Sequence, residues 1–221
     1  MPKKISRLAW LILTLVVWLL LYFRLSTRNQ PTVNNLPPAI QTKQTSQDAS
    51  SSPTLLNSNL ADPVANWQSR VNKKPFGIYV TPQNSPVQPE RFTGYHTGID
   101  IEYEETAADI PVFALTDGVI RQTGCVNGYG GVLVMAFHWQ EQDYTALYGH
   151  LRLGSLPAIG TRIQRGQQIG LLGTNHSQET DGERRHLHLA IHKGSTVELK
   201  GYVDNQTLLA NWVDPLTFLI K

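Results

Sequence analysis

Histidines at alternating positions of an apolar segment are the strongest chemical signal in the sequence. The segment runs His186-Leu187-His188-Leu189-Ala190-Ile191-His192. If it forms a strand, its larger aliphatic residues face a core and its histidines face outward together, because alternate residues share a face. The two nearest histidines would lie about 6.5 Å apart along the strand. Packing does not require two imidazoles on one strand face, so the pattern favours a metal-binding or catalytic site.

Two further segments carry residues of the same chemical kind. His96 and Asp100 lie four residues apart, and on a straight strand they would share a face at a separation of about 13 Å. That is too far to share one ion, but Gly98 between them permits a bend or bulge. An imidazole and a carboxylate suit zinc and leave room for a water molecule. His150 ends a third segment, Tyr148-Gly149-His150, and says little by itself.

Short runs of β-branched and aromatic residues, separated by glycine-rich turns such as Asn127-Gly128 and Gly130-Gly131, surround these residues. Apart from Asp204–Trp212, no segment keeps a helical period for longer than about 10 residues. The sequence therefore predicts a mostly β domain with one antiparallel sheet folded over a core. The predicted strands cover Gly118–Thr123, Gly131–Trp139, Tyr144–His150, Ile169–Leu172 and His186–His192.

The three histidine-containing segments, taken in order, resemble the LytM and lysostaphin-type zinc endopeptidases of bacterial cell walls. That family has a His-x-x-x-Asp segment, a lone histidine in a Tyr-x-His-Leu context, and then His-x-His on a strand. The resemblance extends over roughly Phe76 to Leu219. Its other matching segments are Pro111–Ile120, Gly128–Gly131, Gly160–Gly170 and Val213–Pro215.

This resemblance implies an antiparallel β-sheet domain with a substrate groove and a role for each histidine of the three segments. His96, Asp100 and His188 would bind a zinc ion (Zn2+), and His150 and His186 would be the catalytic pair beside it. Two imidazoles and one carboxylate leave a fourth position for a water molecule, whose pKa zinc lowers toward about 7. The substrate implied is the peptide stems of peptidoglycan.

The chain departs from the family pattern at two places. Leu189 and Ala190 follow His188, where the family often has phenylalanine and then glutamate. The loop from Gly173 to Arg185 is longer and more charged than the usual short Gly/Ser/Thr loop, and it is expected to border the groove. This loop bears on substrate preference more than on the zinc site.

The N-terminus predicts a membrane anchor. Leu8–Phe23 contains no charged residue and would span about 24 Å as a helix, and Arg7 and Arg24 can snorkel to reach both interfaces of a core of about 30 Å. No small-residue cleavage site follows, so an uncleaved anchor at 8–24 is favoured over a signal peptide. The basic residues of the 1–7 tail favour a cytoplasmic N-terminus and a single pass through a bacterial inner membrane. The catalytic domain would then be periplasmic, or more generally extracytoplasmic.

Residues 25–59 predict a disordered linker, because Ser, Thr, Asn, Gln and Pro dominate them and apolar periodicity is lacking. The folded domain is expected at 60–221. The first 28 residues hold five basic and no acidic residues, so the sequence pI of about 8.7 comes from the N-terminus. Nucleic-acid binding is therefore not expected, and the basic residues indicate membrane topology.

Other functions remain open to different degrees. The main alternative is a catalytically weak or silent peptidoglycan-binding module that regulates other wall hydrolases, and the sequence leaves a protein activator undetermined. A thiol peptidase built on Cys125, the sole cysteine, is disfavoured because no base lies near it in sequence. The chain has no Gly-x-Ser-x-Gly elbow of a serine hydrolase. His138, His176 and His192 have no family role and are expected to be structural or exposed.

Overall fold

The computed structural model describes residues 60–220 of the chain. The predicted membrane anchor at 8–24 and the predicted linker at 25–59 lie outside these residues. Within residues 60–220, no helix is both long and apolar enough to cross a bilayer. The described part is mostly β, and every pair of strands in it is antiparallel, which confirms the predicted fold class of the domain.

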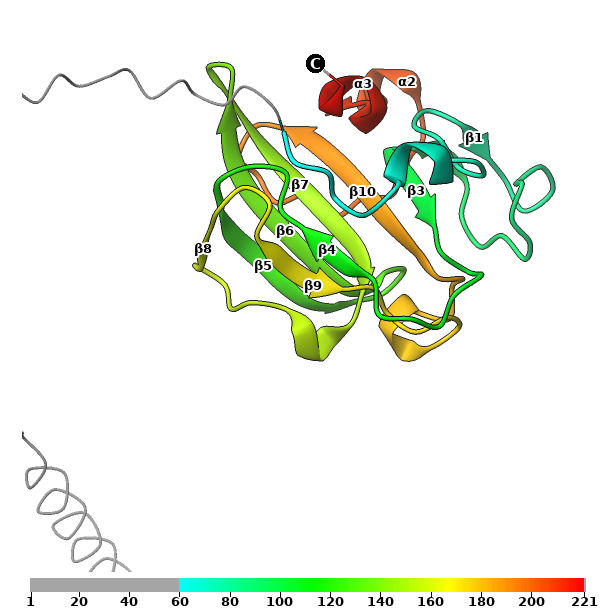
Figure 1. Cartoon of the computed structure of the whole chain (residues 1–221). Coiled ribbons are helices and arrows are strands. Elements are labelled where there is room, and N and C mark those ends of the chain that lie inside the picture. Colours follow the sequence, from blue (N-terminus) through cyan, green and yellow to red (C-terminus); the bar gives the residue numbers. More distant parts are fainter. Residues whose placement is uncertain (1–59, 221) are drawn as a thin grey trace, which may run out of the picture. The chain divides into compact units, whose positions relative to one another are not determined.

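A seven-stranded sheet forms the centre of the domain, and its long strands lie side by side in Figure 1. The spatial order is β12 (Trp212–Val213), β10 (His186–Lys193), β7 (Gln142–Leu151), β6 (Gly130–Trp139), β5 (Gly118–Val126) and β8 (Arg162–Ile163), with β3 (Gly98–Glu102) paired to β10. β10 pairs with β7 along one edge and with β3 and then β12 along the other. This central strand carries the alternating histidines.

Both faces of the central strands are buried. Leu187, Leu189 and Ile191 are fully buried in the larger hydrophobic cluster, as the alternation predicts. The opposite face, however, is not turned outward as expected, because His186 and His188 are also buried. A smaller hydrophobic cluster covers that face, formed by Tyr129, Val132, Val134, Leu147, Ala190, Val203 and Trp212.

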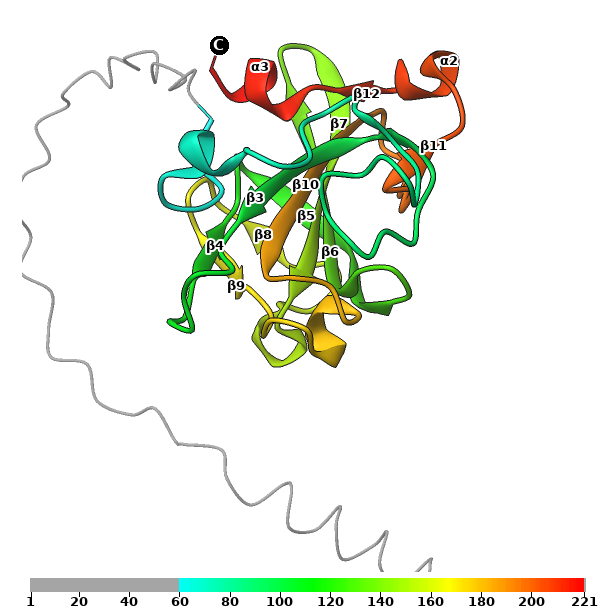
Figure 2. The same cartoon turned by 90° about the vertical axis from the view of Figure 1, so that its right-hand side faces the viewer.

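Two smaller sheets accompany the central one, so the prediction of a single sheet is wrong. β1 (Tyr79–Val80), β2 (Gly94–His96) and β11 (Tyr202–Val203) form a three-stranded sheet with β2 in the middle. β11 lies next to the loop between β1 and β2 in Figure 2. β4 (Pro111–Phe113) pairs with β9 (Gln168–Leu171) in a two-stranded sheet. These short strands lack the length at which alternation becomes a recognisable pattern.

The helices of the described part are short. The helical signal near Asp204–Trp212 corresponds to α2 (Gln206–Leu209), and α3 (Pro215–Leu219) begins after an Asp214 cap whose side chain accepts a hydrogen bond from the Leu216 N–H. Proline at the first helical position is typical of a helix start. The 3-10 helices are η1 (Trp67–Arg70), η2 (Leu153–Ser155) and η3 (Gln178–Thr180).

Candidate metal centre

A break between two sheets brings His96 and Asp100 together. His96 ends β2 in the three-stranded sheet, and Asp100 lies in β3 of the central sheet. The straight-strand separation therefore does not apply, and His96 Nε2 lies 3.2 Å from Asp100 Oδ1. Gly98 allows β3 to approach β10, since a Cβ there would lie 2.4 Å from the carbonyl oxygen of Leu189. Gly98 was predicted to permit a bend, but in the structure it permits close contact between β3 and β10.

His188 completes a group of three potential ligands. It lies opposite Asp100 in the β10–β3 ladder, and its Nδ1 is 3.1 Å from Asp100 Oδ1 and 3.0 Å from His96 Nε2. These three residues each offer a ligand atom, all within 4.8 Å of one another, and all three residues are buried. Ligand atoms bonded at 2.0–2.1 Å to a tetrahedral zinc ion lie about 3.3 Å from each other. The spacing and the two-imidazole, one-carboxylate donor set therefore fit zinc.

Hydrogen bonds orient the ligand candidates for this role. His96 Nδ1 donates to the Pro75 carbonyl oxygen at 3.2 Å, which leaves Nε2 with its lone pair toward the group. Such an outer contact fixes the ring orientation and tautomer of a metal-binding histidine. His188 presents Nδ1 to the group, while its buried Nε2 has no hydrogen-bond partner among the described residues.

His150 lies at an irregularity in the pairing of β6 with β7. Gly131 pairs with Leu151 and Val132 pairs with Gly149, so His150 is skipped in the ladder. A Cβ at Gly131 would lie 1.9 Å from the Leu151 carbonyl oxygen, so glycine is required there. The φ of His150 is 63°, in the left-handed region. A bulge of this kind redirects a side chain, and local backbone strain often marks functional sites.

His150 and His186 form a second pair beside the ligand candidates. Their ring centroids are 4.2 Å apart. His150 Nδ1 donates to the Thr180 carbonyl oxygen at 3.2 Å, and His186 Nδ1 donates to the Arg184 carbonyl oxygen at 2.9 Å. Each ring is thereby fixed through Nδ1 and keeps Nε2 for another partner. His186 Nε2 lies 3.4 Å from Asp100 Oδ2.

Burial sets the protonation states of this group. It lowers the pKa of His150 to about 3, and it lowers the pKa values of His186 and His188 below the ordinary histidine value. Burial also acts to raise the pKa of Asp100, but His186, His96 and the hydrogen bond from His188 hold this pKa well below its usual range. Near pH 7 His150, His186 and His188 are therefore neutral and Asp100 is ionised, the forms in which these groups bind metal ions.

A buried ion pair adjoins the group, and the sequence did not indicate it. Arg184 Nη2 donates to Asp100 Oδ2 at 2.8 Å and to Glu102 Oε1 at 2.6 Å, and Arg184 Nε donates to Glu102 Oε2 at 2.9 Å. The side chains of all three residues are almost inaccessible to solvent. Arginine in a charged loop gives no spacing signal, so only the folded structure identifies it as a neighbour of Asp100.

Asp100, His150, His186 and His188 line a pocket of about 300 Å³, whereas His96 is fully buried behind it. Glu183 and Arg184 also line the pocket, so the 173–185 loop borders the site as expected. The remaining lining residues, none of which was proposed from the sequence as a site residue, include Lys74, Phe92, Asn127, Tyr129, Leu199 and Tyr202.

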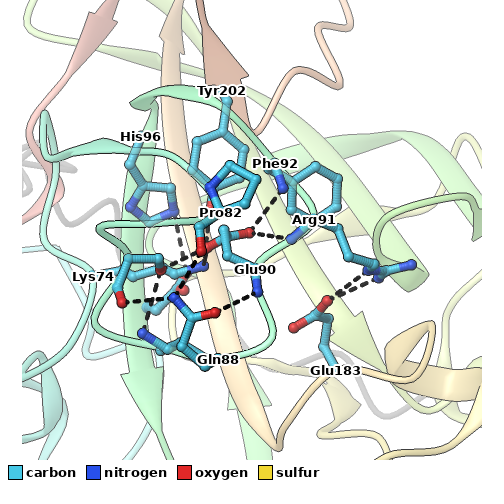
Figure 3. Close-up of polar contacts among 12 residues, drawn as sticks. Lys74, Pro82, Gln88, Glu90, Arg91, Phe92, His96, Glu183 and Tyr202 are labelled. Atoms are coloured by element: carbon cyan, nitrogen blue, oxygen red, sulfur yellow. Dashed lines mark hydrogen bonds and ion pairs between the residues drawn. The ribbon is translucent and has the colours of Figure 1, made fainter.

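The segment between β1 and β2 contributes Phe92 to the pocket lining, beside Lys74 and Tyr202 of β11 (Figure 3). The Lys74 ammonium donates to Glu90 Oε2 at 2.5 Å and to the Tyr202 hydroxyl at 3.0 Å. The ring of Tyr202 stacks on Phe92 at 5.3 Å between centroids and contacts the ring of His96 at 5.2 Å. Tyr202 therefore contacts a ligand candidate directly, with Phe92 stacked on its ring.

The remaining histidines are not among the residues that line this pocket. His138 is exposed and lies 2.8 Å from Asp143 Oδ1, and His176 Nδ1 donates to the Gly182 carbonyl oxygen. His192 packs edge-on against Trp212. Cys125 is exposed on β5 and is not among the pocket residues.

The domain is thus an antiparallel β structure that buries a potential zinc site of two histidines and one aspartate, a ligand set suited to metal-dependent hydrolysis. Residues 94–200 match the family model of peptidase family M23. This match agrees with the family resemblance that the sequence motifs indicate.

The comparison with solved structures gave several matches, each with a TM-score below 0.5. The catalytic domain of the antimicrobial peptidase lysostaphin from Staphylococcus simulans is 21% identical, with 72% of this chain and 100% of that chain covered and a TM-score of 0.49. LytU is 24% identical over 67% of this chain and 83% of its own, with a TM-score of 0.46. Csd3 from Helicobacter pylori is 19% identical, with 73% of this chain and 33% of that chain covered and a TM-score of 0.41. The comparison with curated proteins gave no match.

Proposed function

We propose that this chain is a zinc-dependent endopeptidase that hydrolyses the peptide cross-links of bacterial peptidoglycan. One observation carries the proposal: His96, Asp100 and His188 converge from three strands, and His150 and His186 stand beside them at one pocket. The M23 domain supports peptidase chemistry. A ligand set with every candidate position filled favours an active enzyme over a silent binding module.

His96, Asp100 and His188 would hold the zinc ion. When bound, the ion supplies a Lewis acid that polarises a carbonyl group and lowers the pKa of a water molecule. His150 and His186 are neutral near pH 7, because burial lowers both pKa values, and each is fixed through Nδ1. Their Nε2 atoms can accept a proton from the attacking water, return it to the leaving amine, or steady the developing oxyanion.

The proposal includes a place in the cell. The N-terminal anchor would hold the chain in the inner membrane with the domain on the outer side, and the linker would let it reach peptidoglycan. Protease added to spheroplasts should then degrade the domain while the N-terminus stays with the membrane. Recovery of a soluble, N-terminally shortened form would contradict the anchor.

Digestion of purified peptidoglycan sacculi tests the activity. The full-length chain in detergent should release soluble muropeptides, a chelator should stop the release, and added zinc should restore it. Mass analysis of the products would identify the bond that is cut. A chain that binds zinc and sacculi but releases no muropeptide would favour the alternative of a regulatory peptidoglycan-binding module.

A further inference from the structure

Arg184 is placed where it can control one metal ligand. Its side chain is only 3% exposed, and its Nε and Nη2 atoms make four hydrogen bonds to two carboxylates. Glu102 accepts three of these bonds and Asp100 accepts the fourth. A planar guanidinium suits this arrangement, because its donors form a fixed fork that two acceptors can share.

Strand register explains how the three charged residues meet. Asp100 and Glu102 are two residues apart on β3 and therefore share a face. They pair across the ladder with His188 and His186 of β10, respectively. Arg184 precedes His186 by two residues and continues the same row just before the strand begins. Its guanidinium reaches back along this row to both carboxylates.

The two oxygens of Asp100 face different partners. Oδ1 lies 3.1 Å from His188 Nδ1 and 3.2 Å from His96 Nε2, so it faces the proposed metal position. Oδ2 accepts the 2.8 Å hydrogen bond from Arg184. Rotation of the carboxylate that brought both oxygens to a metal ion would break this bond in a buried site.

We propose that Arg184, held by Glu102, is a positioning residue that restricts Asp100 to binding the metal through Oδ1 alone. Glu102 accepts three hydrogen bonds from the guanidinium and so fixes its position. The positive charge of Arg184 is divided between the carboxylates of Glu102 and Asp100, so Asp100 keeps part of its negative charge for a metal ion. Lysine would not replace it, because an ammonium is a point charge without the fork that spans both carboxylates. The inference rests on the metal site of the proposed function.

Metal binding by the full-length chain in detergent tests this role without measuring hydrolysis. The variants are Arg184→Lys and the double variant Glu102→Gln/Arg184→Met, which removes both buried charges and leaves no unpaired carboxylate at position 102. Lys73→Met is the matched control, because the Lys73 ammonium is 3.9 Å from Glu102 and has no contact with Asp100. Circular dichroism of the metal-free forms establishes that each variant folds.

Zinc affinity, measured by competition with a chelator, should fall about 10- to 100-fold in Arg184→Lys, the usual effect of losing an outer partner of a metal ligand. Cobalt(II) bound in place of zinc reports coordination number, since four-coordinate cobalt absorbs visible light more strongly than five-coordinate cobalt. In the double variant Asp100 is free to bind through both oxygens, so this absorption should decrease. Lys73→Met should match the unaltered chain in both measurements.

Folded variants with unaltered zinc affinity and an unaltered cobalt spectrum would overturn the role of Arg184. If the unaltered chain binds neither metal, this inference and the proposed function both fail. If the chain binds metal and the variants behave as expected but no muropeptide is released, Arg184 keeps its role and only the proposed hydrolysis fails.

Discussion

Buried histidines with different hydrogen-bond partners can perform different tasks within one small site. His188 directs Nδ1 toward Asp100 and His96, as a ligand would. His186, two residues earlier on the same strand face, instead donates through Nδ1 to a backbone carbonyl oxygen. His150 does the same from a neighbouring strand. Within β10, the hydrogen bonds therefore distinguish the proposed ligand His188 from the proposed acid–base residue His186.

This division predicts distinct effects of alanine substitution. His150→Ala and His186→Ala should each keep zinc but lose at least about a hundredfold in hydrolysis rate, the usual value of general acid–base assistance. The combined variant should lose less than the product of the two effects, because the residues act as a unit. Zinc content and the rate of muropeptide release measure the two properties separately.

His188→Ala is the control, since it should lose most of the bound zinc. The opposite result, with zinc lost from His186→Ala and kept in His188→Ala, would exchange the two roles within β10.

The motifs and the family resemblance together indicated the five proposed site residues, but not their surroundings. His-x-His and His-x-x-x-Asp are compact patterns with a chemical meaning, and the structure places their members together. The contacts of Arg184 depend on the register of β3 and β10, which no local pattern reveals. The same holds for Lys74, which reaches the pocket from a segment outside the motifs.

At the scale of elements, the contact between β3 and β10 sets the geometry of the ligands. Gly98 lies opposite Ala190 in this ladder, against the backbone of Leu189. The approach of the two strands depends on the absence of a side chain at position 98. Asp100 lies two residues further along β3 and pairs with His188, so the same close approach of the strands sets the distance between Asp100 and His188.

Gly98→Ala should therefore both destabilise the domain and weaken metal binding. The new Cβ would lie 2.4 Å from a backbone oxygen, so β3 must shift, at a cost of about 1–3 kcal/mol. Thermal unfolding and zinc affinity measure the two effects. Gly154→Ala is the matched control, because a Cβ there meets nothing within 4 Å. Equal behaviour of the two variants would show that β3 does not need this close contact.

The segment between β1 and β2 is held by Glu90. Its carboxylate accepts hydrogen bonds from the Lys74 ammonium, the Ser85 hydroxyl and the backbone N–H groups of Arg91 and Phe92. Burial acts to raise the pKa of Glu90, but the hydrogen bonds, that from Lys74 foremost, lower it below the ordinary value of 4.5. The stabilisation that the ionised Glu90 carboxylate gives the folded domain is therefore present at pH values above the ordinary glutamate pKa. It is lost as the pH falls through the lowered pKa of Glu90 in the folded state.

Glu90→Gln should reduce stability near neutral pH by on the order of 3 kcal/mol, because it leaves the Lys74 ammonium buried without its counter-ion. The stability of the variant should also depend less on pH in the acid range, because glutamine at position 90 does not titrate. Urea unfolding at about pH 7 and about pH 3.5 measures both, since the ordinary glutamate pKa lies between these values. Glu141→Gln, at an exposed turn, is the control. A Glu90 variant as stable as the control at neutral pH would exclude this role.

Length and turn signals determined which elements the sequence could predict. The predicted strand at Gly131–Trp139 differs from β6 by one residue, because it is long, β-branched and preceded by a glycine turn. β8, β11 and β12 have two residues each and owe their pairing to neighbours far away in sequence. The helical signal at Asp204–Trp212 was broader than the four-residue α2.

At the scale of the whole domain, the central sheet separates two unequal hydrophobic clusters. The larger cluster packs on one face of β10 and includes Leu187, Leu189 and Ile191. The smaller cluster and the candidate site share the other face, with Val203 of β11 among the residues that cover it. The site therefore lies on the side of the sheet with less apolar burial, where local opening costs less free energy.

The proposed ligands come from two different sheets. His96 belongs to the three-stranded sheet, whereas Asp100 and His188 belong to the central sheet. A bound ion would join the two sheets as a cross-link. Chelation should therefore speed amide hydrogen exchange in β1, β2 and β11 and leave the exchange of β5 and β6 nearly unaltered. Uniform acceleration in all these strands, or none, would argue against such a cross-link.

A metal cross-link that can be withdrawn would make the lifetime of the protein depend on the supply of the proposed zinc ion. When zinc is scarce, the three-stranded sheet should open more often and expose its chain to the proteases of the compartment. When zinc is plentiful, the closed form should accumulate. Cells grown with and without a zinc chelator should therefore differ in the half-life of this chain, and the His96→Ala variant should turn over rapidly in both.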